Sequence, residues 1–250
     1  MEDCWLGLMI GNSRLHWSYF SNDKLVKTWN TPQVSSLTEL PKVIDDQLKK
    51  LLLRKIPLYV ASVVPSATKI YFPLPQTHII NCSLIPLQNV YPTMGIDRIL
   101  ALWGGGCYYG FPCLVIDSGT ALTLTGADPQ ANVVGGAILP GVRLQLQSLF
   151  FNTASLPEIE VICGETPRWA NDTPHAIQSG VIHTIVSGIK DFSEDWLSRF
   201  PQSKVILTGG DARLLSEYLN KLYPQHNNHF LVDSNLIFRG MQNYYHLLEN

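Results

Sequence analysis

The chain has 250 residues, of which 46% are hydrophobic and 15% charged, so it can bury a large core and form one large domain or two lobes. Its formal net charge of −2 and its lack of a Lys/Arg run exclude a cationic surface for nucleic acid or an anionic membrane. The five cysteines lack the short paired spacings of a zinc site and the density of a secreted disulfide scaffold. We therefore expect reduced thiols and a cytoplasmic protein.

Two segments share a strand–turn–strand pattern and begin two halves of comparable length. Leu6–Phe20 places Gly, Asn and Ser between two apolar stretches, and Leu114–Gly126 repeats the plan around Ser, Gly and Thr. Further strands and helices alternate after each hairpin. This order predicts a two-lobed α/β protein.

The first half is predicted to continue with alternating strands and helices. The uncharged stretch Ile99–Ile116 is long enough to cross a membrane, but Gly104–Gly106 and Pro112 interrupt it, so we expect a helix that stops at the glycines and then a buried strand. The predicted elements are a strand at Lys24–Trp29, a helix at Leu37–Leu53 with its N-cap near Ser36, strands at Leu58–Val64 and Thr77–Asn81, and a helix at Ile96–Tyr108.

The second half repeats this order after its hairpin. The segment Phe151–Asn171 is the least regular, and it is either a flap, a partner-contacting loop or a plain surface connection. The predicted elements are a strand at Asn132–Ile138, a helix from Pro140–Gly141 to Leu149, a helix at Thr173–Phe192, a strand at Lys204–Leu207, a helix at Asp211–Leu222 with Asp211 as N-cap, a strand at His229–Val232 and a helix at Ser234–Leu248.

One carboxylate stands out in an almost uncharged region. Ile99–Pro157 holds 59 residues but three charged side chains, and one of them, Asp117, ends an apolar stretch. An ionised carboxylate in such surroundings requires a metal, a positive side chain or polar groups around it. Asp117 is either a cation ligand beside the turn that follows it or the cap of that turn.

Three glycine-containing turns could hold a nucleotide. In Gly11–Ser13 and Ser118–Thr120, missing Cβ atoms and short hydroxyls suit phosphate oxygens, although the same residues are usual in structural hairpins. Thr208–Ala212 joins a strand to a helix through two glycines, which would let a purine lie against the backbone. The sequence has neither a P-loop nor a dinucleotide-binding fingerprint.

A pair of opposite charges begins the apolar helix predicted at residue 96. Asp97 and Arg98 fit ordinary first-turn electrostatics, in which the carboxylate lies at the positive end of the helix dipole. Alternatively, Asp97 accepts the proton of a substrate hydroxyl and Arg98 binds a substrate anion.

Six motifs taken together resemble one known family, the type III pantothenate kinases, over residues 6 to 240. In order, they are Gly11-Asn12-Ser13, Gly95-Ile96-Asp97-Arg98, Asp117-Ser118-Gly119-Thr120-Ala121-Leu122-Thr123, Gly135-Gly136-Ala137-Ile138-Leu139-Pro140-Gly141, Asn171-Asp172-Thr173 with Ala176 and Gly180, and Thr208-Gly209-Gly210-Asp211-Ala212.

This resemblance implies an acetate-and-sugar-kinase/actin-like fold of two ribonuclease-H-like lobes. Each lobe would contain a mixed sheet that opens with an antiparallel meander and is flanked by helices. The N-terminal lobe would comprise residues 1–110 joined by the C-terminal helix 233–250, and the C-terminal lobe residues 111–232. The implied enzyme is a homodimer that phosphorylates pantothenate with ATP in the cleft, the first step of coenzyme A synthesis.

The resemblance also implies a role for individual residues. Asp97 would be the general base, and Asp117 would bind a monovalent cation, K⁺ or NH₄⁺. Pantothenate would contact Tyr91, Gly95, Ile96, Asp97, Arg98 and Thr173. ATP, with Mg²⁺, would contact the first hairpin and the second lobe at Met9, Gly11, Asn12, Ser13, His16, Thr120, Gly209 and Gly210.

Two of these positions depart from the family pattern. Met9 occupies the place of an aspartate and His16 that of a lysine, and a thioether is a poor ligand for Mg²⁺. Near pH 7 an unshifted imidazole is mostly neutral. Either Asp117 and the ATP oxygens hold the metal without help, or turnover is weak; the alternative function is a catalytically weak or inactive relative with a regulatory or scaffolding role.

Overall fold

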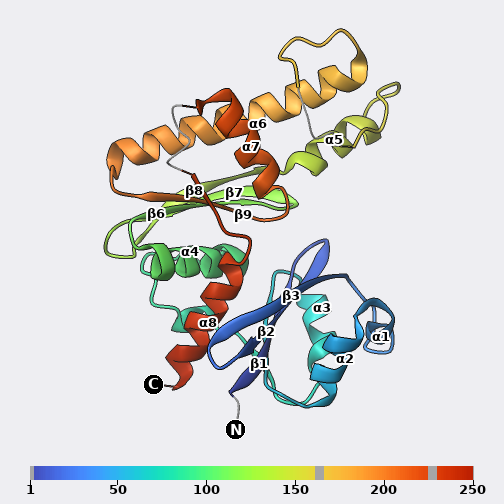
Figure 1. Ribbon diagram of the computed structural model, residues 1–250, viewed down its shortest axis with the longest axis vertical. Helices are drawn as coiled ribbons and strands as arrows, with labels where there is room; N and C mark the ends of the chain where they lie inside the picture. The colour runs from blue at the N-terminus through green and yellow to red at the C-terminus, as the bar shows by residue number, and fades with distance from the viewer. Residues whose placement is uncertain (1–2, 161–165, 225–229, 250) are drawn as a thin grey trace. The chain divides into compact units, whose positions relative to one another are not determined.

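The structure is a computed structural model that describes residues 3–160, 166–224 and 230–249. The chain forms two compact units (Figure 1): unit 1 comprises Met1–Gly104 and Ile237–Asn250, and unit 2 comprises Gly105–Leu236. Within the described residues, each unit contains one five-stranded mixed sheet with flanking helices. The predicted fold class of two such lobes is confirmed.

The sheet of unit 1 has the strand order β3-β2-β1-β4-β5. Its first three strands form an antiparallel meander, and β4 and β5 run parallel to β1. The elements are β1 (Cys4–Ile10), β2 (Arg14–Ser21), β3 (Lys24–Pro32), α1 (Leu40–Val43), α2 (Asp46–Leu53), β4 (Leu58–Ser62), α3 (Pro65–Thr68), the 3₁₀ turns η1 (Lys69–Tyr71) and η2 (Cys82–Leu84), β5 (Thr77–Ile79), and parts of α4 (Ile96–Tyr109) and α8 (Leu236–Glu249).

Both faces of this sheet are covered, which explains why every residue of β1 is buried. Leu6 and Leu8 contribute to a core with α1 and α2, because alternate side chains of a strand point to the same face. On the other face, Trp5 stacks on Phe20 at 4.0 Å and on Tyr245 of α8 at 5.0 Å between ring centroids. The first hairpin is therefore held from two sides.

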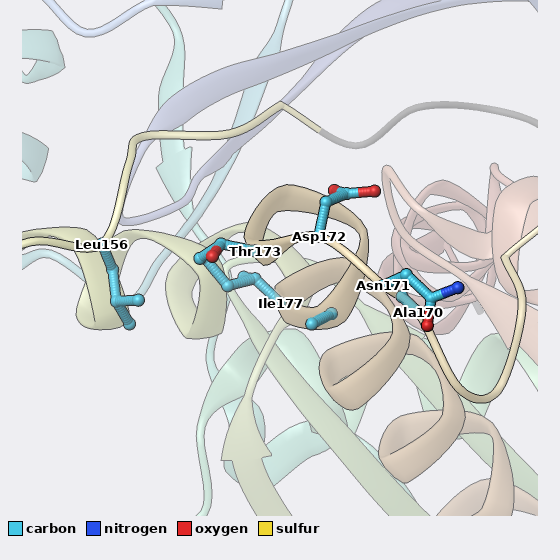
Figure 2. A pocket seen from close by; sticks show the side chains of 7 residues that line it. Leu156, Ala170, Asn171, Asp172, Thr173 and Ile177 are labelled. Atoms are coloured by element: carbon cyan, nitrogen blue, oxygen red, sulfur yellow. The ribbon is translucent and has the colours of Figure 1, made fainter.

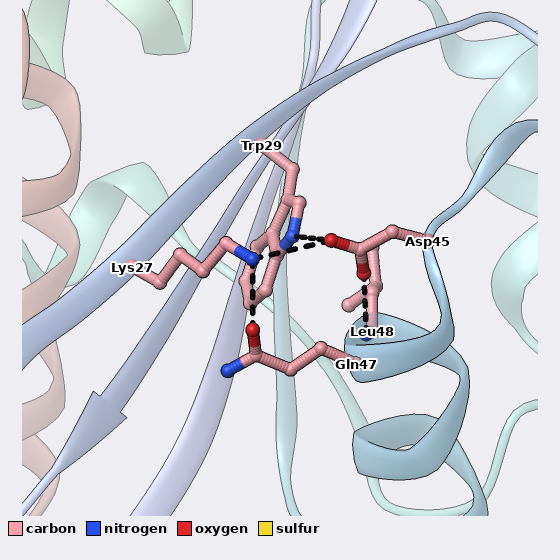
Figure 3. Close-up of polar contacts among 5 residues, drawn as sticks. All are labelled: Lys27, Trp29, Asp45, Gln47 and Leu48. Atoms are coloured by element: carbon pink, nitrogen blue, oxygen red, sulfur yellow. Dashed lines mark hydrogen bonds and ion pairs between the residues drawn. The ribbon is translucent and has the colours of Figure 1, made fainter.

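The N-terminus of α2 is tied to strand β3 by one carboxylate (Figure 3). Asp45 Oδ1 accepts the backbone N–H of Leu48 at 2.8 Å, and its Oδ2 accepts Trp29 Nε1 at 2.7 Å and Lys27 Nζ at 3.2 Å. Lys27 also donates to Gln47 Oε1 at 2.7 Å. The prediction of a single helix over Leu37–Leu53 is wrong. The helix is interrupted after Val43, because Asp45 is extended and caps the N-terminus of α2. The N-cap of α1 is Glu39 instead of Ser36.

The sheet of unit 2 has the order β10-β9-β6-β7-β8 and repeats the meander. Strands β6, β7 and β8 are antiparallel, and β9 and β10 extend the sheet in parallel from β6. The elements are β6 (Cys113–Ser118), β7 (Ala121–Ala127), β8 (Val133–Pro140), α5 (Val142–Phe151), α6 (Thr173–Arg199), β9 (Lys204–Thr208), α7 (Ala212–Leu222) and β10 (Phe230–Val232).

Helices α5, α6 and α7 form a layer on one face of this sheet (Figure 1). Leu114 and Ile116 face that layer, whereas Val115 lies beside Gly105 of α4. The helix α6 is longer than predicted and continues past Phe192 to Arg199, because Trp196 still belongs to the same core.

The glycines in α4 do not end the helix, so that prediction is wrong. A Cβ atom at Gly106 would lie 1.9 Å from the ring of Phe111, and one at Gly105 would lie 3.1 Å from Val115. Glycine is present there because the helix packs closely, and α4 continues to Tyr109. The expected helix followed by a buried strand is confirmed by α4 and β6.

The predicted start of the helix at Pro140–Gly141 is also wrong. Pro140 ends strand β8, where it pairs with Ala121, and Gly141 is the N-cap of α5. Parts of two predicted segments, residues 161–165 of the irregular stretch and His229 of a strand, lie outside the described residues. Over the residues that the structure describes, no helix combines the length and hydrophobicity needed to cross a membrane.

We predict that Asp45→Ala lowers the free energy of unfolding by about 1 kcal/mol near pH 7, since it removes an N-cap. The hydrogen bond from Leu48 N–H lowers the pKa of Asp45 below its usual value, despite the opposing effect of partial burial. The contribution of this carboxylate is therefore complete above the unfolded-state pKa and is lost as the pH falls through the lower folded-state pKa.

Urea unfolding of both proteins between pH 7 and pH 3 measures this effect. Asp46→Ala is the control, because Asp46 is the neighbouring exposed residue and makes one ion pair to Lys49. A difference between wild type and Asp45→Ala that does not shrink below about pH 4 contradicts the assignment.

Candidate functional site

The carboxylate of Asp117 lies against backbone in unit 2. Asp117 is the fifth residue of β6 and pairs with Thr208 of β9 across the sheet. A Cβ atom built at Gly209 would lie 2.3 Å from Asp117 Oδ1, and one at Gly119 would lie 3.4 Å from it. Gly209 has φ +89°, a conformation that favours glycine. Asp117 and Gly209 are 92 positions apart in the chain, and their two motifs meet because Gly209 leaves room for the carboxylate.

Three hydrogen bonds connect the turn after Asp117 to residues outside the hairpin turn. Ser118 Oγ donates to the carbonyl of Thr208 at 2.8 Å, and the N–H of Asp211 donates to the carbonyl of Ser118 at 3.0 Å. The N–H of Gly141 donates to the carbonyl of Thr120 at 2.9 Å. Residues 117–120, 141 and 208–211 thus form one assembled group, with Thr120 and Gly210 exposed.

An ion pair between exposed Arg143 of α5 and buried Asp211 lies beside this group. Asp211 is 8% exposed, and Arg143 Nε lies 3.6 Å from its Oδ1. Burial raises the pKa of Asp211, while the guanidinium of Arg143 acts in the opposite direction. Asp211 occupies the predicted N-cap position of α7, but its side chain makes no capping hydrogen bond and faces Arg143 instead.

In unit 1, the Gly11–Ser13 turn connects β1 and β2. The N–H of Gly11 donates to the carbonyl of Arg14 at 3.0 Å, which closes the turn. Asn12 and Ser13 are exposed, and the edge of the His16 ring lies 3.8 Å from the position of a Cβ at Gly11. The predicted phosphate turn therefore projects from the end of the buried hairpin.

The two positions that depart from the family pattern face each other across this hairpin. Met9 of β1 pairs with His16 of β2, and Met9 is buried. Burial lowers the pKa of His16, although its Nδ1 contact with Asn30 Oδ1 at 2.6 Å acts to raise it. His16 is therefore neutral near pH 7 and does not supply the positive charge of a lysine.

The predicted base and anion-binding residue begin α4. The N–H of Arg98 donates to Asp97 Oδ1 at 2.8 Å, and a Cβ at Gly95 would lie 2.4 Å from the same oxygen. Arg98 is buried and donates to the hydroxyl of Tyr91, with its guanidinium carbon 5.8 Å from the ring centroid. These four residues form one cluster.

Within unit 1, this cluster and the Gly11 turn share an intermediate residue. Val63, which follows β4, lies 3.9 Å from the position of a Cβ at Gly95, and its N–H donates to the carbonyl of Ile10 at 3.1 Å. Ile10 directly precedes Gly11. The parallel pairing of β1 with β4 therefore places the two predicted sites of this unit at the same end of the sheet.

Thr173 lies at an open pocket of about 440 Å³ at the N-terminus of α6 (Figure 2). Asp172 caps the helix by accepting the N–H of His175 at 3.0 Å, and His175 Nδ1 lies 2.8 Å from both oxygens of Asp172. These bonds lower the pKa of Asp172. The pocket is lined by Leu156, Ala170, Asn171, Asp172, Thr173, Ala176 and Ile177.

The segment that leads into this pocket is anchored by polar side chains of α6 and α7. Gln178 Nε2 and the hydroxyl of Tyr218 each contact Thr166 Oγ1 at 2.8 Å, and His183 Nε2 contacts the carbonyl of Thr166 at 3.1 Å. Ser179 Oγ donates to the carbonyl of Arg168 at 2.9 Å. Residues 166–168 are thus attached to the helix that carries Thr173.

The described residues contain no cluster of three His, Cys, Asp or Glu side chains that could enclose a metal ion. Mg²⁺ commonly takes one or two protein carboxylates and completes its shell with phosphate oxygens and water. The thioether of buried Met9 is a poor ligand for this hard cation.

Comparisons with known proteins agree with the predicted family. The family model for type III pantothenate kinase matches residues 5–195. The type III pantothenate kinase of Nostoc sp. (strain PCC 7120) is 46% identical over 260 aligned residues, which cover 97% of this chain and 94% of the relative. The chain belongs to the type III pantothenate kinase family.

Other comparisons agree with this membership. The type III pantothenate kinase of Synechocystis sp. (strain PCC 6803) is 46% identical over 244 residues, covering 97% of this chain and 90% of the relative. A solved structure with a similar fold is the activator of 2-hydroxyisocaproyl-CoA dehydratase from Clostridium difficile with bound ADPNP. Its TM-score is 0.53 at 13% sequence identity, and the match covers 100% of this chain and 95% of the activator chain. This likeness concerns the fold alone, and it agrees with the predicted two-lobed α/β architecture.

Two residues that no sequence motif indicated, Arg143 and Gln33, lie at the predicted sites. Arg143 is one of the three charged residues in Ile99–Pro157, so the scarcity that marked Asp117 could have marked it too. Gln33 follows strand β3 and contacts the Gly11–Ser13 turn, and no local pattern distinguishes it from an ordinary loop residue.

We predict that Gly209→Ala destabilises unit 2 by about 2 kcal/mol or more, because the new methyl group would meet Asp117 and the backbone of Ser118 in a strained conformation. Gly210→Ala is the matched control, since nothing lies within 4 Å of a Cβ at that position. Its expected effect is about 0.5 kcal/mol or less. Equal unfolding midpoints in urea for the two variants would contradict the close approach.

Proposed function

We propose that this member of the type III pantothenate kinase family transfers the γ-phosphoryl group of ATP to the hydroxyl of pantothenate and forms 4′-phosphopantothenate. The observation that carries the proposal is the geometry of Asp97. Its carboxylate is oriented by the Arg98 N–H and lies where Gly95 leaves room for it, so an acceptor oxygen is held in place. Such a group is suited to receive a proton from an alcohol.

Asp97 would orient the hydroxyl of pantothenate and accept its proton. In phosphoryl transfer, the transition state is loose and the proton leaves late, so a carboxylate of ordinary basicity is sufficient. The second oxygen of Asp97 remains for the substrate while Oδ1 receives the Arg98 N–H.

Arg98, Tyr91 and Thr173 would bind pantothenate. The guanidinium of Arg98 is held by the Tyr91 hydroxyl, which limits its motion and suits it to pair with a carboxylate. Thr173 lies at a pocket that joins apolar side chains to the polar N-terminus of α6, as expected for a ligand with apolar and polar parts.

The glycine turns would bind ATP. Backbone N–H groups at Gly11–Ser13 and the hydroxyl of Thr120 would face phosphate oxygens, and Gly209–Gly210 would leave space for the remainder of the nucleotide. Asp117 would hold a monovalent cation, K⁺ or NH₄⁺, and Mg²⁺ would be held chiefly by the nucleotide. When bound, these ions supply positive charge that offsets the charge of the phosphates.

We further propose a cytoplasmic homodimer. The homodimer is supported by the family resemblance. The cytoplasmic location is supported by the cysteines, since within the described part of the chain Cys4, Cys82, Cys107 and Cys113 form no disulfide. Burial raises the pKa of Cys113 to about 12, so this thiol stays protonated at neutral pH.

A second candidate function is supported by Met9 and His16. Met9 provides no carboxylate for Mg²⁺, and His16 is neutral, so two charges typical of the family's ATP site are missing. A catalytically weak or inactive relative that binds nucleotide and acts as a regulatory or scaffolding protein would have the same fold.

We expect ADP release by the purified chain to depend on pantothenate, in a coupled assay with ATP, Mg²⁺ and K⁺. Omission of pantothenate is the control for background ATP hydrolysis. If a folded sample that binds ATP shows no pantothenate-dependent release, the regulatory function is favoured and the kinase proposal is wrong.

We predict that Asp97→Asn lowers kcat by about 100-fold, since an amide cannot accept the proton, while ATP affinity is preserved. Asparagine keeps an oxygen that can accept the Arg98 N–H, so the start of α4 should be retained. Steady-state kinetics and binding of a non-hydrolysable ATP analogue measure the two effects. Asp46→Asn, an exposed change in the same unit, is the control, and an unchanged kcat in Asp97→Asn would remove the base assignment.

A further inference from the structure

The side-chain amide of Gln33 donates two hydrogen bonds to the backbone of the Gly11–Ser13 turn. Gln33 Nε2 donates to the carbonyl oxygen of Gly11 at 2.5 Å and to that of Asn12 at 2.9 Å. The residue directly follows strand β3, 22 positions from Gly11 in the chain, and is partly buried. Two consecutive peptide groups of the turn are therefore attached to one amide.

The chemistry of this contact requires a donor with two hydrogens. Both acceptors are carbonyl oxygens, so the NH₂ end of the amide must face them, and its two N–H groups match the two oxygens. A carboxylate of the same size would place its negative charge against the same oxygens. The contact therefore discriminates glutamine from glutamate, although the two have nearly the same shape.

Holding the carbonyls also determines where the amide groups of the turn point. Both peptide bonds are trans, and in a trans peptide the C=O and the N–H point in opposite directions. With the carbonyls of Gly11 and Asn12 directed at Gln33, the N–H of the following residue in each peptide, Asn12 and then Ser13, is directed away from it. Successive N–H groups on one side of a turn form a concave surface that suits an anion.

The two positions beside this turn that depart from the family pattern bring no charge to the phosphates. Met9 carries no charge, and neutral His16 has its Nδ1 at Asn30. Phosphate binding by this hairpin must then depend more on the direction of its backbone N–H groups, and so on whatever fixes that direction before ATP arrives.

We infer that Gln33 is a positioning residue for ATP, which holds the Gly11–Ser13 turn in its phosphate-binding conformation. The inference rests on the proposed function, in which this turn faces the phosphates. Gln33 itself does not touch the nucleotide. Its loss raises the entropic cost of ordering the turn, and this cost falls on ATP binding and not on pantothenate binding.

Gln33→Met and Gln33→Glu test this inference. Methionine keeps the length of the side chain and removes both donors, and glutamate replaces them with an anion. Because Gln33→Met removes two hydrogen bonds, we expect the Kd of a non-hydrolysable ATP analogue and the KM for ATP to rise about tenfold. In Gln33→Glu both values should rise further. The KM for pantothenate should remain within about twofold of wild type.

Gln47→Met is the matched control, because Gln47 is an exposed glutamine of the same unit whose side chain contacts Lys27. It should leave both KM values unchanged. Thermal unfolding of all variants shows whether each is folded. A folded Gln33→Met with unchanged affinity for the ATP analogue overturns the inference, as does an equal rise in the KM for both substrates.

The same measurements separate this inference from the proposed function. If the wild type binds the analogue but has no pantothenate-dependent turnover, the kinase proposal fails, and the Kd values of the Gln33 variants still decide the role of Gln33. If the wild type does not bind the analogue, both are overturned.

Discussion

The predicted sites of both units depend on the same kind of contact. In each, a carboxylate oxygen lies against a glycine that has no room for a side chain. In unit 1, a Cβ at Gly95 would lie 2.4 Å from Asp97, and in unit 2, a Cβ at Gly209 would lie 2.3 Å from Asp117. Any other residue at either glycine would displace the carboxylate or the backbone. The orientation of these acids therefore depends on the absence of two methyl groups.

The sheets provide the rigid support for these contacts. Each unit buries its central strand, β1 or β6, between antiparallel and parallel neighbours, and the glycine turns extend from the ends of these strands. Hydrogen bonds then fix each turn from outside the hairpin, through Gln33 in unit 1 and through Gly141 and Asp211 in unit 2. A turn fixed in this way can bind an anion with little loss of conformational entropy.

Much of the fold could be predicted from local patterns. The alternation of apolar residues in Leu6–Phe20 and Leu114–Gly126 predicted both hairpins, because a strand with a buried face requires period two. Helix limits were predicted less well. The Gly104–Gly106 stretch predicts a helix end, but Gly106 instead lets α4 pack closely on Phe111, a contact that no local pattern contains.

The sequence by itself determined the family, the two-lobed α/β fold and the motifs around Asp97 and Asp117, since these depend on residue types and their order along the chain. Tertiary structure alone decided that Gly209 lies against Asp117, that Arg143 faces Asp211 and that Gln33 holds the turn at Gly11. Each of these contacts joins residues at least 22 positions apart in the chain, and their distances result from strand pairing and helix packing. Spacing along the chain does not encode such distances.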